Sequence, residues 1–498
     1  MATIPEVGDS NITTKETTMD STYPRIGLHI DGEWLYDRPA YTEVFNPSNE
    51  ATLGSVPGAT PEDLSRALAA AERGFRVWRD TPPLQRAQLL LRTCALVRER
   101  AESIAEILTL EQGKPIADAR NEVARATAFL EWDAAEAQRL YGSIVPAGPQ
   151  MQQMILRLPV GPVAAFTPWN VPIGSPARKI SGAIAAGCSV IIKAAEETPG
   201  TACAFVQCFI DAGLPPGVLN LVFGNPSLIS STLIASPAIR MVTFTGSVAV
   251  GKHLTQLAAA AMKPVLMELG GHAPVLIGAD VDAAALGKLA GSAKMRLAGQ
   301  FCASPTRFII HQKSYAAFVD AFAKAASEVR VGDGFEPGVQ MGPLLNAKRM
   351  VAIDELVQDA KACGARVAAG GQRIGERGFF YALTVLADVP AHAKAMSTEP
   401  FGPMALCVQV ADLDEGIALA NSLSVGLAGY AFTNSLEEAE RFTRELECGV
   451  LSINHFGMCG ADTPFGGVKE SGIGREGGAQ SLEPYTITKT VLQRTARV

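Results

Sequence analysis

The sequence has no long apolar run and no excess of positive charge. Without a stretch of about 18 apolar residues, no membrane-spanning helix is expected. Acidic residues outnumber basic ones, 50 to 43, which gives a net charge of -7. This balance argues against general binding to nucleic acid or to an anionic membrane, because both need a basic surface. A small molecule is the expected ligand, and an anionic one held by local arginines is compatible with this charge.

Cysteine patterns that mark a zinc site or a disulfide framework are also missing. The nine cysteines are irregularly spaced, with no C-x-x-C pair and no Cys/His zinc pattern, so no metal site is expected. The N-terminal residues are polar and aperiodic and contain no apolar signal core, so a disordered tail is expected at 1–22. Reduced thiols and a cytoplasmic location are the expectation from these two features.

What the sequence does contain is a recurring unit of an apolar run, a turn and an amphipathic helical pattern. Strand-like runs at Cys188–Lys193, Val218–Phe223 and Met241–Phe244 are each followed by such a helical pattern. Thr60, followed by a proline and with Asp63 three residues on, is a helix-start signal. Strands that alternate with helices predict an α/β fold with a parallel, doubly wound sheet, which binds ligands beyond the carboxyl ends of its strands.

The length of the chain predicts more than one structural unit. With 498 residues, 48% of them hydrophobic, we expect a large core divided over two to four units. An expected boundary is Gly270-Gly271, after which a second series of strands and helices fills residues 273–449. Extended segments at 142–159 and 483–498 lie outside both series. They predict an oligomerisation arm and a homo-oligomer, because exposed strand edges need a partner.

Two glycine-rich motifs resemble nucleotide-binding fingerprints, but each lacks a part. Gly472–Gly477 fits G-x-G-x-x-G without an apolar strand before it or a long helix after it. Gly246–Lys252 fits the start of a P-loop, but His253 stands where the magnesium-binding Ser or Thr is required. The second motif still joins a strand to a helix start, where free backbone N–H groups favour a phosphate.

Cys302 differs in its setting from the other cysteines, most of which lie in apolar or helical patterns. It occupies a turn-like stretch after Gly299-Gln300, where its own backbone N–H can point at a bound carbonyl oxygen. A thiol nucleophile needs an activating partner, and no histidine has a triad-like context. Glu268, an acid within apolar strand residues, is a better candidate because burial raises the pKa of a carboxyl and suits it to act as a base. The alternatives are a buried structural cysteine and a glutamate that caps a turn.

Seven short motifs occur along the chain in a fixed order, and together they closely resemble the NAD(P)-dependent aldehyde dehydrogenase superfamily. The resemblance extends from about Gly27 to the end of the chain. Each motif alone is weak, but their order and spacing are specific. They are Thr167-Pro168-Trp169-Asn170, Lys193-Ala194-Ala195-Glu196, Phe244-Thr245-Gly246-Ser247, Glu268-Leu269-Gly270-Gly271, Gly299-Gln300-Phe301-Cys302, Glu399-Pro400-Phe401-Gly402-Pro403 and Pro464-Phe465-Gly466-Gly467.

The resemblance implies a role for four catalytic residues. Cys302 matches the nucleophile that attacks the aldehyde to give a thiohemiacetal, which becomes a thioester after hydride transfer to the nicotinamide. Asn170 matches the side chain that holds the oxyanion together with the Cys302 backbone N–H. Glu268 matches the base that activates water to hydrolyse the thioester. Lys179 matches a lysine near the oxyanion.

The resemblance also implies a cofactor site. Lys193 and Glu196 match the pair that binds the adenosine ribose. A carboxylate there accepts from both ribose hydroxyls and repels a 2′-phosphate, so NAD is favoured, while the lysine leaves NADP possible. The other cofactor residues implied are Gly246 and Ser247 at the pyrophosphate, Glu399 and Phe401 at the nicotinamide ribose, and Thr167, Trp169 and Gly224 along the cleft.

The fold implied is a Rossmann-like NAD-binding domain with an α/β catalytic domain and a small β oligomerisation arm. Residues 23–141 and 160–271 would form the NAD-binding domain and residues 272–482 the catalytic domain. The arm would comprise 142–159 and 483–498, and would join the chains into a dimer or a tetramer.

The substrate site resembles that of succinate-semialdehyde dehydrogenases. Arg178 and Arg296 match two arginines that clamp a distal carboxylate, which suits an anionic tail. Cys459 stands where those enzymes carry a serine, Phe456 adds bulk, and His272 replaces the usual Lys or Asn with unknown effect. Succinic semialdehyde is the first candidate. Other ω-carboxy or sulfonated aldehydes, an aliphatic aldehyde, and an aromatic aldehyde stacked on Phe456 stay open, as does a structural role for the arginines.

Two rival classes remain. One is a cofactor-independent cysteine hydrolase or acyltransferase that uses Cys302 and Glu268. The other is a non-catalytic protein on the same scaffold. The nucleotide-site residues Lys193, Glu196 and Glu399 count against the first, and the joint presence of Cys302, Glu268 and Asn170 counts against the second.

Overall fold

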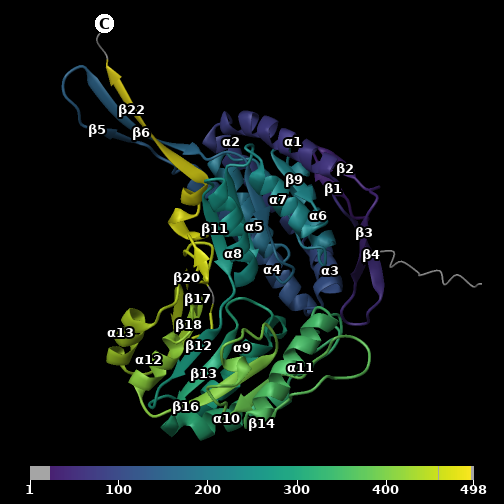
Figure 1. Ribbon diagram of the computed structural model, residues 1–498, viewed down its shortest axis with the longest axis vertical. Helices are drawn as coiled ribbons and strands as arrows, with labels where there is room; N and C mark the ends of the chain where they lie inside the picture. The colour runs from purple at the N-terminus through teal and green to yellow at the C-terminus, as the bar shows by residue number, and fades with distance from the viewer. Residues whose placement is uncertain (1–22, 458, 495–498) are drawn as a thin grey trace, which may run out of the picture.

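The computed structural model describes residues 23–457 and 459–494, so the tail expected at 1–22 lies outside the described residues. Two mixed α/β units lie one above the other, and a narrow three-stranded arm projects from them (Figure 1). The expected α/β fold with its projecting β arm is therefore present. No helix of the described residues is long and apolar enough to cross a bilayer.

The first sheet has eight strands, of which the central five run parallel in the order β9-β8-β7-β10-β11. Their short apolar sequences are almost entirely buried, as expected for a parallel sheet covered on both faces. The strands are β1 (Leu28–Ile30), β2 (Glu33–Leu35), β7 (Val163–Phe166), β8 (Val190–Lys193), β9 (Leu219–Val222), β10 (Met241–Gly246), β11 (Val265–Leu269) and β21 (Gly472–Ile473).

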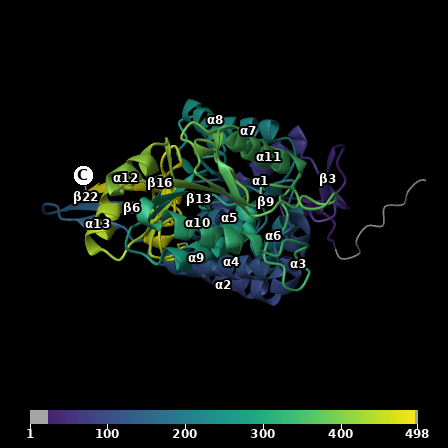
Figure 2. The same ribbon diagram turned by 90° about the horizontal axis from the view of Figure 1, so that it is seen from below.

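Helices cover both faces of this sheet. On one face, α1 and α8 pack against the strands. On the other face, α5 and α6 pack against the strands, and α2, α3 and α4 form an outer layer on α5 and α6. Figure 2 shows α7 and α8 on the opposite side of the molecule from α2 and α4. The helices are α1 (Pro61–Arg79), α2 (Pro83–Glu99), α3 (Ala101–Gln112), α4 (Ile116–Ala137), α5 (Gly174–Ala186), α6 (Pro199–Asp211), α7 (Pro226–Ala235) and α8 (Val248–Ala260).

The second sheet has seven strands in the order β14-β15-β16-β13-β12-β18-β19, all parallel except the β14–β15 pair. The strands are β12 (Ala273–Ile277), β13 (Pro305–His311), β14 (Arg366–Ala369), β15 (Thr384–Ala387), β16 (Met404–Val410), β18 (Ala428–Phe432) and β19 (Val450–Ile453). The helices are α9 (Ala283–Met295), α10 (Gln312–Ser327), α11 (Ala347–Ala362), α12 (Leu413–Asn421) and α13 (Leu436–Glu445). The chain from β12 onward also contains four short 3-10 turns, η1 (Arg296–Gly299), η2 (Lys394–Met396), η3 (Gly478–Gln480) and η4 (Glu483–Tyr485).

The projecting arm is an antiparallel sheet in the order β22-β6-β5. Its strands are β5 (Ser143–Val145), β6 (Met151–Pro159) and β22 (Thr486–Arg494), so both segments expected to form an arm do pair with each other. Two further pairs are β3 (Tyr41–Phe45) with β4 (Thr52–Pro57) and β17 (Val425–Gly426) with β20 (Val468–Lys469).

Local signals read from the sequence agree with the structure at several places. Thr60 caps α1, and Asp63 completes a capping box with it. Gly472–Gly477 does not form a strand–turn–helix. It opens with β21, which pairs antiparallel with β11 through Glu268 and Gly472 at the edge of the first sheet. The motif therefore extends the edge of the first sheet next to Glu268 and is not a dinucleotide fingerprint.

Candidate active site

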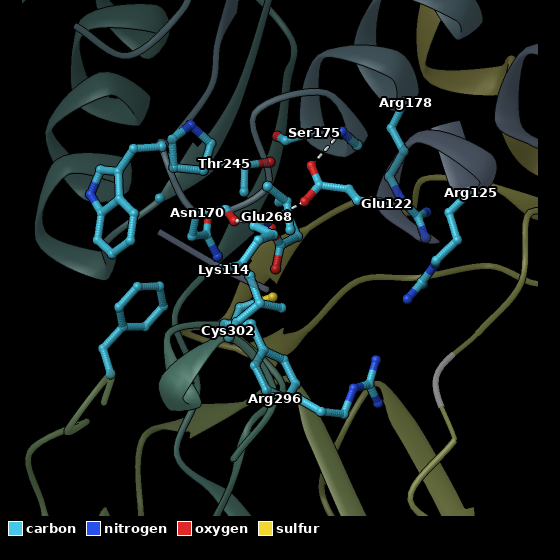
Figure 3. A pocket seen from close by; sticks show the side chains of 18 of the residues that line it. Lys114, Glu122, Arg125, Asn170, Ser175, Arg178, Thr245, Glu268, Arg296 and Cys302 are labelled. Atoms are coloured by element: carbon cyan, nitrogen blue, oxygen red, sulfur yellow. Dashed lines mark hydrogen bonds and ion pairs between the residues drawn. The ribbon is translucent and has the colours of Figure 1, made fainter. Parts of the chain in front are cut away.

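A cavity of about 1150 Å³ lies between the two α/β units (Figure 3). It collects residues from the ends of β10 and β11, from α4 and α5, and from the loop after η1. Its lining includes Lys114, Glu122, Arg125, Trp169, Asn170, Arg178, Gly246, Ser247, Glu268, Arg296, Cys302, Arg349, Glu399, Phe401, Phe465 and Glu476. Most residues expected to act on substrate or cofactor therefore meet in one place.

The loop that carries Cys302 has an unusual backbone. Leu297 and Ala298 both have φ of 51°, and Gly299 has φ of 70°. A side chain at Gly299 would come within 2.1 Å of the Gly402 carbonyl oxygen, so only glycine fits there. The buried Gln300 side chain fixes the loop by accepting from the Leu345 N–H at 3.0 Å and donating to the Pro343 carbonyl at 3.3 Å. The thiol is thus presented from a strained, well-anchored turn.

Glu268 lies near the carboxyl end of β11 and is only 5% exposed. Burial and the negative charge of Glu476 raise the pKa of the Glu268 carboxyl to about 7. A hydrogen bond with the Cys302 thiol and the charges of Lys179 and Arg178 act in the opposite direction. Oε1 of Glu268 has no hydrogen-bond partner among the described residues. A carboxyl in this state can accept a proton near neutral pH.

The Cys302 thiol is held in its protonated form. Burial, then the negative charge of Glu268 and the hydrogen bond to it, raise the pKa of the thiol well above its ordinary value. A thiolate forms here only as the proton leaves, and Glu268 is the group in position to accept it. The two groups expected to work together are therefore in contact.

Asn170 lies beside this pair. Its Nδ2 donates to the Gln300 carbonyl at 3.0 Å, and its Oδ1 has no partner among the described residues. Its backbone carbonyl accepts from Lys114 Nζ at 3.0 Å, and Lys114 in turn forms a buried salt bridge with Glu122. Glu122 accepts from the backbone N–H groups of Ile173 and Gly174, at 3.1 and 3.2 Å. Lys114 and Glu122 were not predicted from the sequence, because nothing in their spacing points to Asn170.

On the cofactor side, the cavity is lined by Gly246 and Ser247 at the start of α8 and by the loop around Glu399 and Phe401. Ser247 caps α8 and accepts from the Val250 N–H at 3.4 Å, which leaves the first-turn N–H groups for an anion. The Phe401 ring meets Trp169 edge to face at 5.6 Å. Burial raises the pKa of the Glu399 carboxyl to about 8, and this carboxyl lies so close to Gly270 that a side chain there would be 2.3 Å from its Oε2.

Arg349 supports the same loop and was missed by the sequence reasoning. It donates through Nη2 to the carbonyl oxygens of Pro400 and Phe401, the latter at 3.1 Å. Phe401 has φ of 44°, a strained value for a residue with a side chain, so an anchor at this point is required. No motif includes Arg349, which lies on α11 far from the loop in sequence.

The expected ribose-binding pair lies at the end of β8 and just after it, outside the lining of this cavity. Lys193 Nζ is 2.7 Å from Glu196 Oε2, while Oε1 of Glu196 accepts from the Gly224 N–H at 2.9 Å. Thr167 also lies outside the lining, and its buried Oγ1 has no partner among the described residues. A carboxylate and an ammonium beside a glycine turn, together with the anion-binding start of α8, fit a dinucleotide that extends from this edge into the cavity.

Three arginines line the opposite wall. Arg178 and Arg296 were expected there, and Arg125 from α4 joins them. Arg178 lies over the rings of Phe129 and Phe465, with 4.1 and 5.1 Å from its guanidinium carbon to the ring centroids. Arg125 was missed because a helical arginine gives no sign of its direction from sequence alone.

Some expected residues are placed differently. Phe456 does not line the cavity, and its ring packs on Tyr430 and Phe432, at centroid distances of 5.3 and 4.8 Å. Cys459 also lies outside the lining, and its carbonyl oxygen is 3.4 Å from Arg125 Nη2.

Lys179 and His272 also lie outside the cavity lining. Lys179 is fully buried and reaches Glu476 Oε1 at 2.6 Å and Thr243 Oγ1 at 3.1 Å. Its charge acts directly on the Glu268 carboxyl, and it also pairs with Glu476, which does line the cavity. His272 is buried between Thr306 Oγ1 and the Ala395 carbonyl, at 2.7 and 2.8 Å. Burial and the charge of Arg307 lower its pKa to about 3, so His272 is neutral and structural.

Comparison with known proteins agrees with this geometry. The family model described as "Aldehyde dehydrogenase family" matches residues 34–491. The 4-(hydroxymethyl)benzenesulfonate dehydrogenase TsaD1 of Comamonas testosteroni is 46% identical over 467 residues, which cover 93% of this chain and 97% of that protein. The succinate-semialdehyde dehydrogenase [NADP(+)] GabD of Escherichia coli is 38% identical and covers 94% of this chain and 98% of its own.

Among solved structures, the NAD+ complex of an aldehyde dehydrogenase from Bacillus cereus has a TM-score of 0.92 and 32% identity, covering 95% of this chain and 97% of that one. The expected fold and enzyme class and the expected use of a nicotinamide cofactor are thereby confirmed. The chain belongs to the aldehyde dehydrogenase family and is an NAD(P)-dependent oxidoreductase that acts on aldehydes.

Proposed function

We propose that this enzyme oxidises an aldehyde with an anionic tail to the carboxylic acid, through a covalent intermediate on Cys302. One observation carries the proposal: a single cavity holds Cys302 beside Glu268 at one end, and at the other end arginines that form no ion pair among the described residues. The first group of residues suits attack on a carbonyl carbon. The second suits an anion at the far end of the same molecule.

The first step proposed is formation of a carbon–sulfur bond. Glu268 accepts the thiol proton as Cys302 Sγ attacks the carbonyl carbon, and the carbonyl oxygen becomes an oxyanion. Asn170 donates one N–H of its amide to Gln300 and has a second N–H left for this oxygen. The backbone N–H of Cys302 supplies the other donor. Two fixed donors stabilise the charge as it develops.

The second half of the reaction regenerates the thiol. A bound nicotinamide supplies the hydride acceptor that turns the thiohemiacetal into a thioester. Glu268 first passes the thiol proton to solvent and then removes a proton from water as the water oxygen attacks the thioester carbon. The carbon–sulfur bond breaks, the acid is released, and Glu268 returns the proton to the Cys302 sulfur. Because the pKa of the Glu268 carboxyl is about 7, it can lose and regain a proton within each cycle at neutral pH.

For the cofactor, we propose NAD with NADP possible. The carboxylate of Glu196 disfavours a 2′-phosphate, whereas Lys193, 2.7 Å from it, offers that phosphate a positive charge. The relatives include one named for NADP(+), the enzyme GabD of Escherichia coli. Thus both cofactors have support, with the carboxylate favouring NAD.

For the substrate, one candidate is succinic semialdehyde, because Arg178 and Arg296 match the clamp of succinate-semialdehyde dehydrogenases. A sulfonated benzaldehyde is the second. The relatives at 46% identity are named for a benzenesulfonate, whereas those named for succinate semialdehyde are 36–38% identical. The phenyl rings of Phe129, Phe301 and Phe465 also belong to the cavity lining. Both candidates share the anionic tail.

The test is the initial rate of NADH formation with succinic semialdehyde and with butanal, which share a four-carbon length. A kcat/KM at least about tenfold higher for the acid, roughly 1.4 kcal/mol, supports an anion site. Equal rates would contradict it. The Cys302→Ala variant should lose activity with both aldehydes, and activity that survives in it would contradict the role of Cys302.

We also propose a homo-oligomer, dimer or tetramer, joined through the sheet of β5, β6 and β22. Apolar residues on this sheet are exposed, including Ile144 at 73% and Leu492 at 64%. Such residues at a strand edge favour a partner. A monomer in light scattering would contradict this.

All nine cysteines are free, which supports the proposed cytoplasmic location.

A further inference from the structure

The wall of the cavity opposite the cofactor side carries three guanidinium groups from three different elements. Arg125 comes from α4, Arg178 from α5 and Arg296 from η1. Figure 3 shows the three side chains turned toward the same part of the cavity, beside Cys302 and Glu268. Arg125 belongs to none of the motifs that identify the family.

These arginines lack the partners that such groups usually have. Among the described residues, none of the three forms a salt bridge. Arg125 has one long hydrogen bond, 3.4 Å to the Cys459 carbonyl, and Nη1 of Arg178 is buried without a hydrogen-bond partner. Arg296 lies over the Phe301 ring, with 5.7 Å from its guanidinium carbon to the centroid. Most donor groups of the three arginines therefore have no partner among the described residues.

Their charges act on one another. Burial and the positive charges of Arg178 and Arg296 lower the pKa of the Arg125 guanidinium, so the three groups are close enough to repel. The nearby acids offset this only in part. Glu122 is already paired with Lys114, and burial raises the pKa of Asp118. Arg125 is exposed at the edge of the cavity, and Arg178 and Arg296 are half-buried. Three neighbouring cations in such a place favour an anion between them.

The number and directions of the donors distinguish between anions. Two arginines suffice for a carboxylate, whose two oxygens lie in one plane and pair bidentately with a guanidinium. A third guanidinium from a separate helix approaches from another direction. A sulfonate is tetrahedral and presents three equivalent oxygens, one for each arginine. Next to these cations lie the rings of Phe129, Phe301 and Phe465, which suit a flat aromatic body.

We propose that Arg125 completes a three-arginine anion site that selects aromatic aldehydes with a sulfonate group over those with a carboxylate. This inference rests on the proposed function, because it names the tail that the same site binds. Arg125 is then a specificity residue and takes no part in the chemistry at Cys302.

The experiment compares 4-sulfobenzaldehyde, 4-carboxybenzaldehyde and benzaldehyde as substrates of the wild-type enzyme, Arg125→Gln and Arg120→Gln. Arg120 is the matched control: it lies on the same helix, is exposed and pairs with Glu102 outside the cavity. We expect the wild type to prefer the sulfonate to the carboxylate by about tenfold or more in kcat/KM. Arg125→Gln should lower that ratio at least tenfold, and Arg120→Gln should leave it unchanged. An unchanged ratio in Arg125→Gln, or a wild type that prefers the carboxylate, overturns the inference.

A binding measurement separates this inference from the proposed function. Titration calorimetry with benzenesulfonate and benzoate needs no turnover, so it reports on the anion site even if every aldehyde fails as a substrate. Benzenesulfonate should bind the wild type at least tenfold more tightly than benzoate does. If Arg125→Gln does not fold, Arg125→Lys, which keeps the charge and loses the planar fork, replaces it in both experiments and should lower the preference. Equal binding of the two anions overturns the inference, and failure of all aldehydes overturns the proposed function alone.

Discussion

Two buried Lys–Glu pairs lie near Cys302, and they differ in what surrounds them. Lys114 and Glu122 have side chains 1% and 8% exposed and bond to the backbone of residues 170, 173 and 174. Lys179 and Glu476 are 0% and 5% exposed, and their neighbour is the carboxyl of Glu268. The first pair fixes the segment that carries Asn170, whereas the second sets the charge felt by the base. A buried Lys–Glu pair thus holds the backbone in place at one position and changes the pKa of a neighbouring carboxyl at the other.

The largest effect is expected from breaking the first pair. Lys114→Met leaves Glu122 buried without its cation, and removal of one partner of a buried pair costs about 3–5 kcal/mol. The melting temperature should fall strongly, as measured by differential scanning calorimetry. Arg120→Met, which breaks the exposed pair with Glu102, is the control and should change it little. An equal change in the two variants would show that the Lys114 pair is not structural.

Loss of the side chain that this pair positions comes next. Asn170→Ala removes one of the two donors to the oxyanion, so kcat should fall by about 10²–10³. The melting temperature should change much less than in Lys114→Met, because no buried charge is left alone. The measurement is kcat at saturating NAD. A fall of less than tenfold would mean that Asn170 holds the Gln300 carbonyl and does little for the oxyanion.

The second pair should be detected in the pH dependence. Glu268 must be deprotonated to act as a base, so activity is present above its pKa of about 7 and is lost as the pH falls through that value. Glu476→Gln removes a negative charge that raises this pKa, so the midpoint of the kcat/KM profile should move to lower pH. A midpoint that stays in place, or moves up, would show that Glu476 does not act on Glu268.

The sequence pointed to the residues that we propose for the chemistry, but not to the residues that hold them in place. Cys302, Glu268 and Asn170 lie in short motifs at strand ends and turns, where position along the chain also fixes position in space. Lys114 lies in the turn before α4, and Arg125 lies on α4. The side of the sheet that this helix covers depends on packing across the whole domain. Their direction is therefore not available from spacing alone.

Phe456 illustrates the same limit in the other direction. Its place in the loop before the Pro464–Gly467 motif favoured a substrate contact, but its ring turns into the core against Tyr430 and Phe432. An aromatic ring in a loop is stabilised by burial, and the sequence does not tell which apolar surface is nearest. The parallel sheet and its helices were predictable because alternation along the chain determines them locally.

A third Lys–Glu pair, Lys193 and Glu196, lies at the edge of the cofactor site, and a change in it should have the smallest effect. Lys193 and Glu196 have side chains 8% and 18% exposed, more than either buried pair. Glu196→Gln keeps an oxygen for the Gly224 N–H but removes the charge that disfavours a 2′-phosphate. For a partly exposed charge we expect about 1 kcal/mol, or roughly a fivefold rise in the ratio of kcat/KM for NADP to that for NAD. Rates with the two cofactors at one aldehyde concentration check this. A ratio that falls would mean that Glu196 acts on the cofactor only through Lys193, and a fall in melting temperature as large as that of Lys114→Met would place this pair with the buried ones.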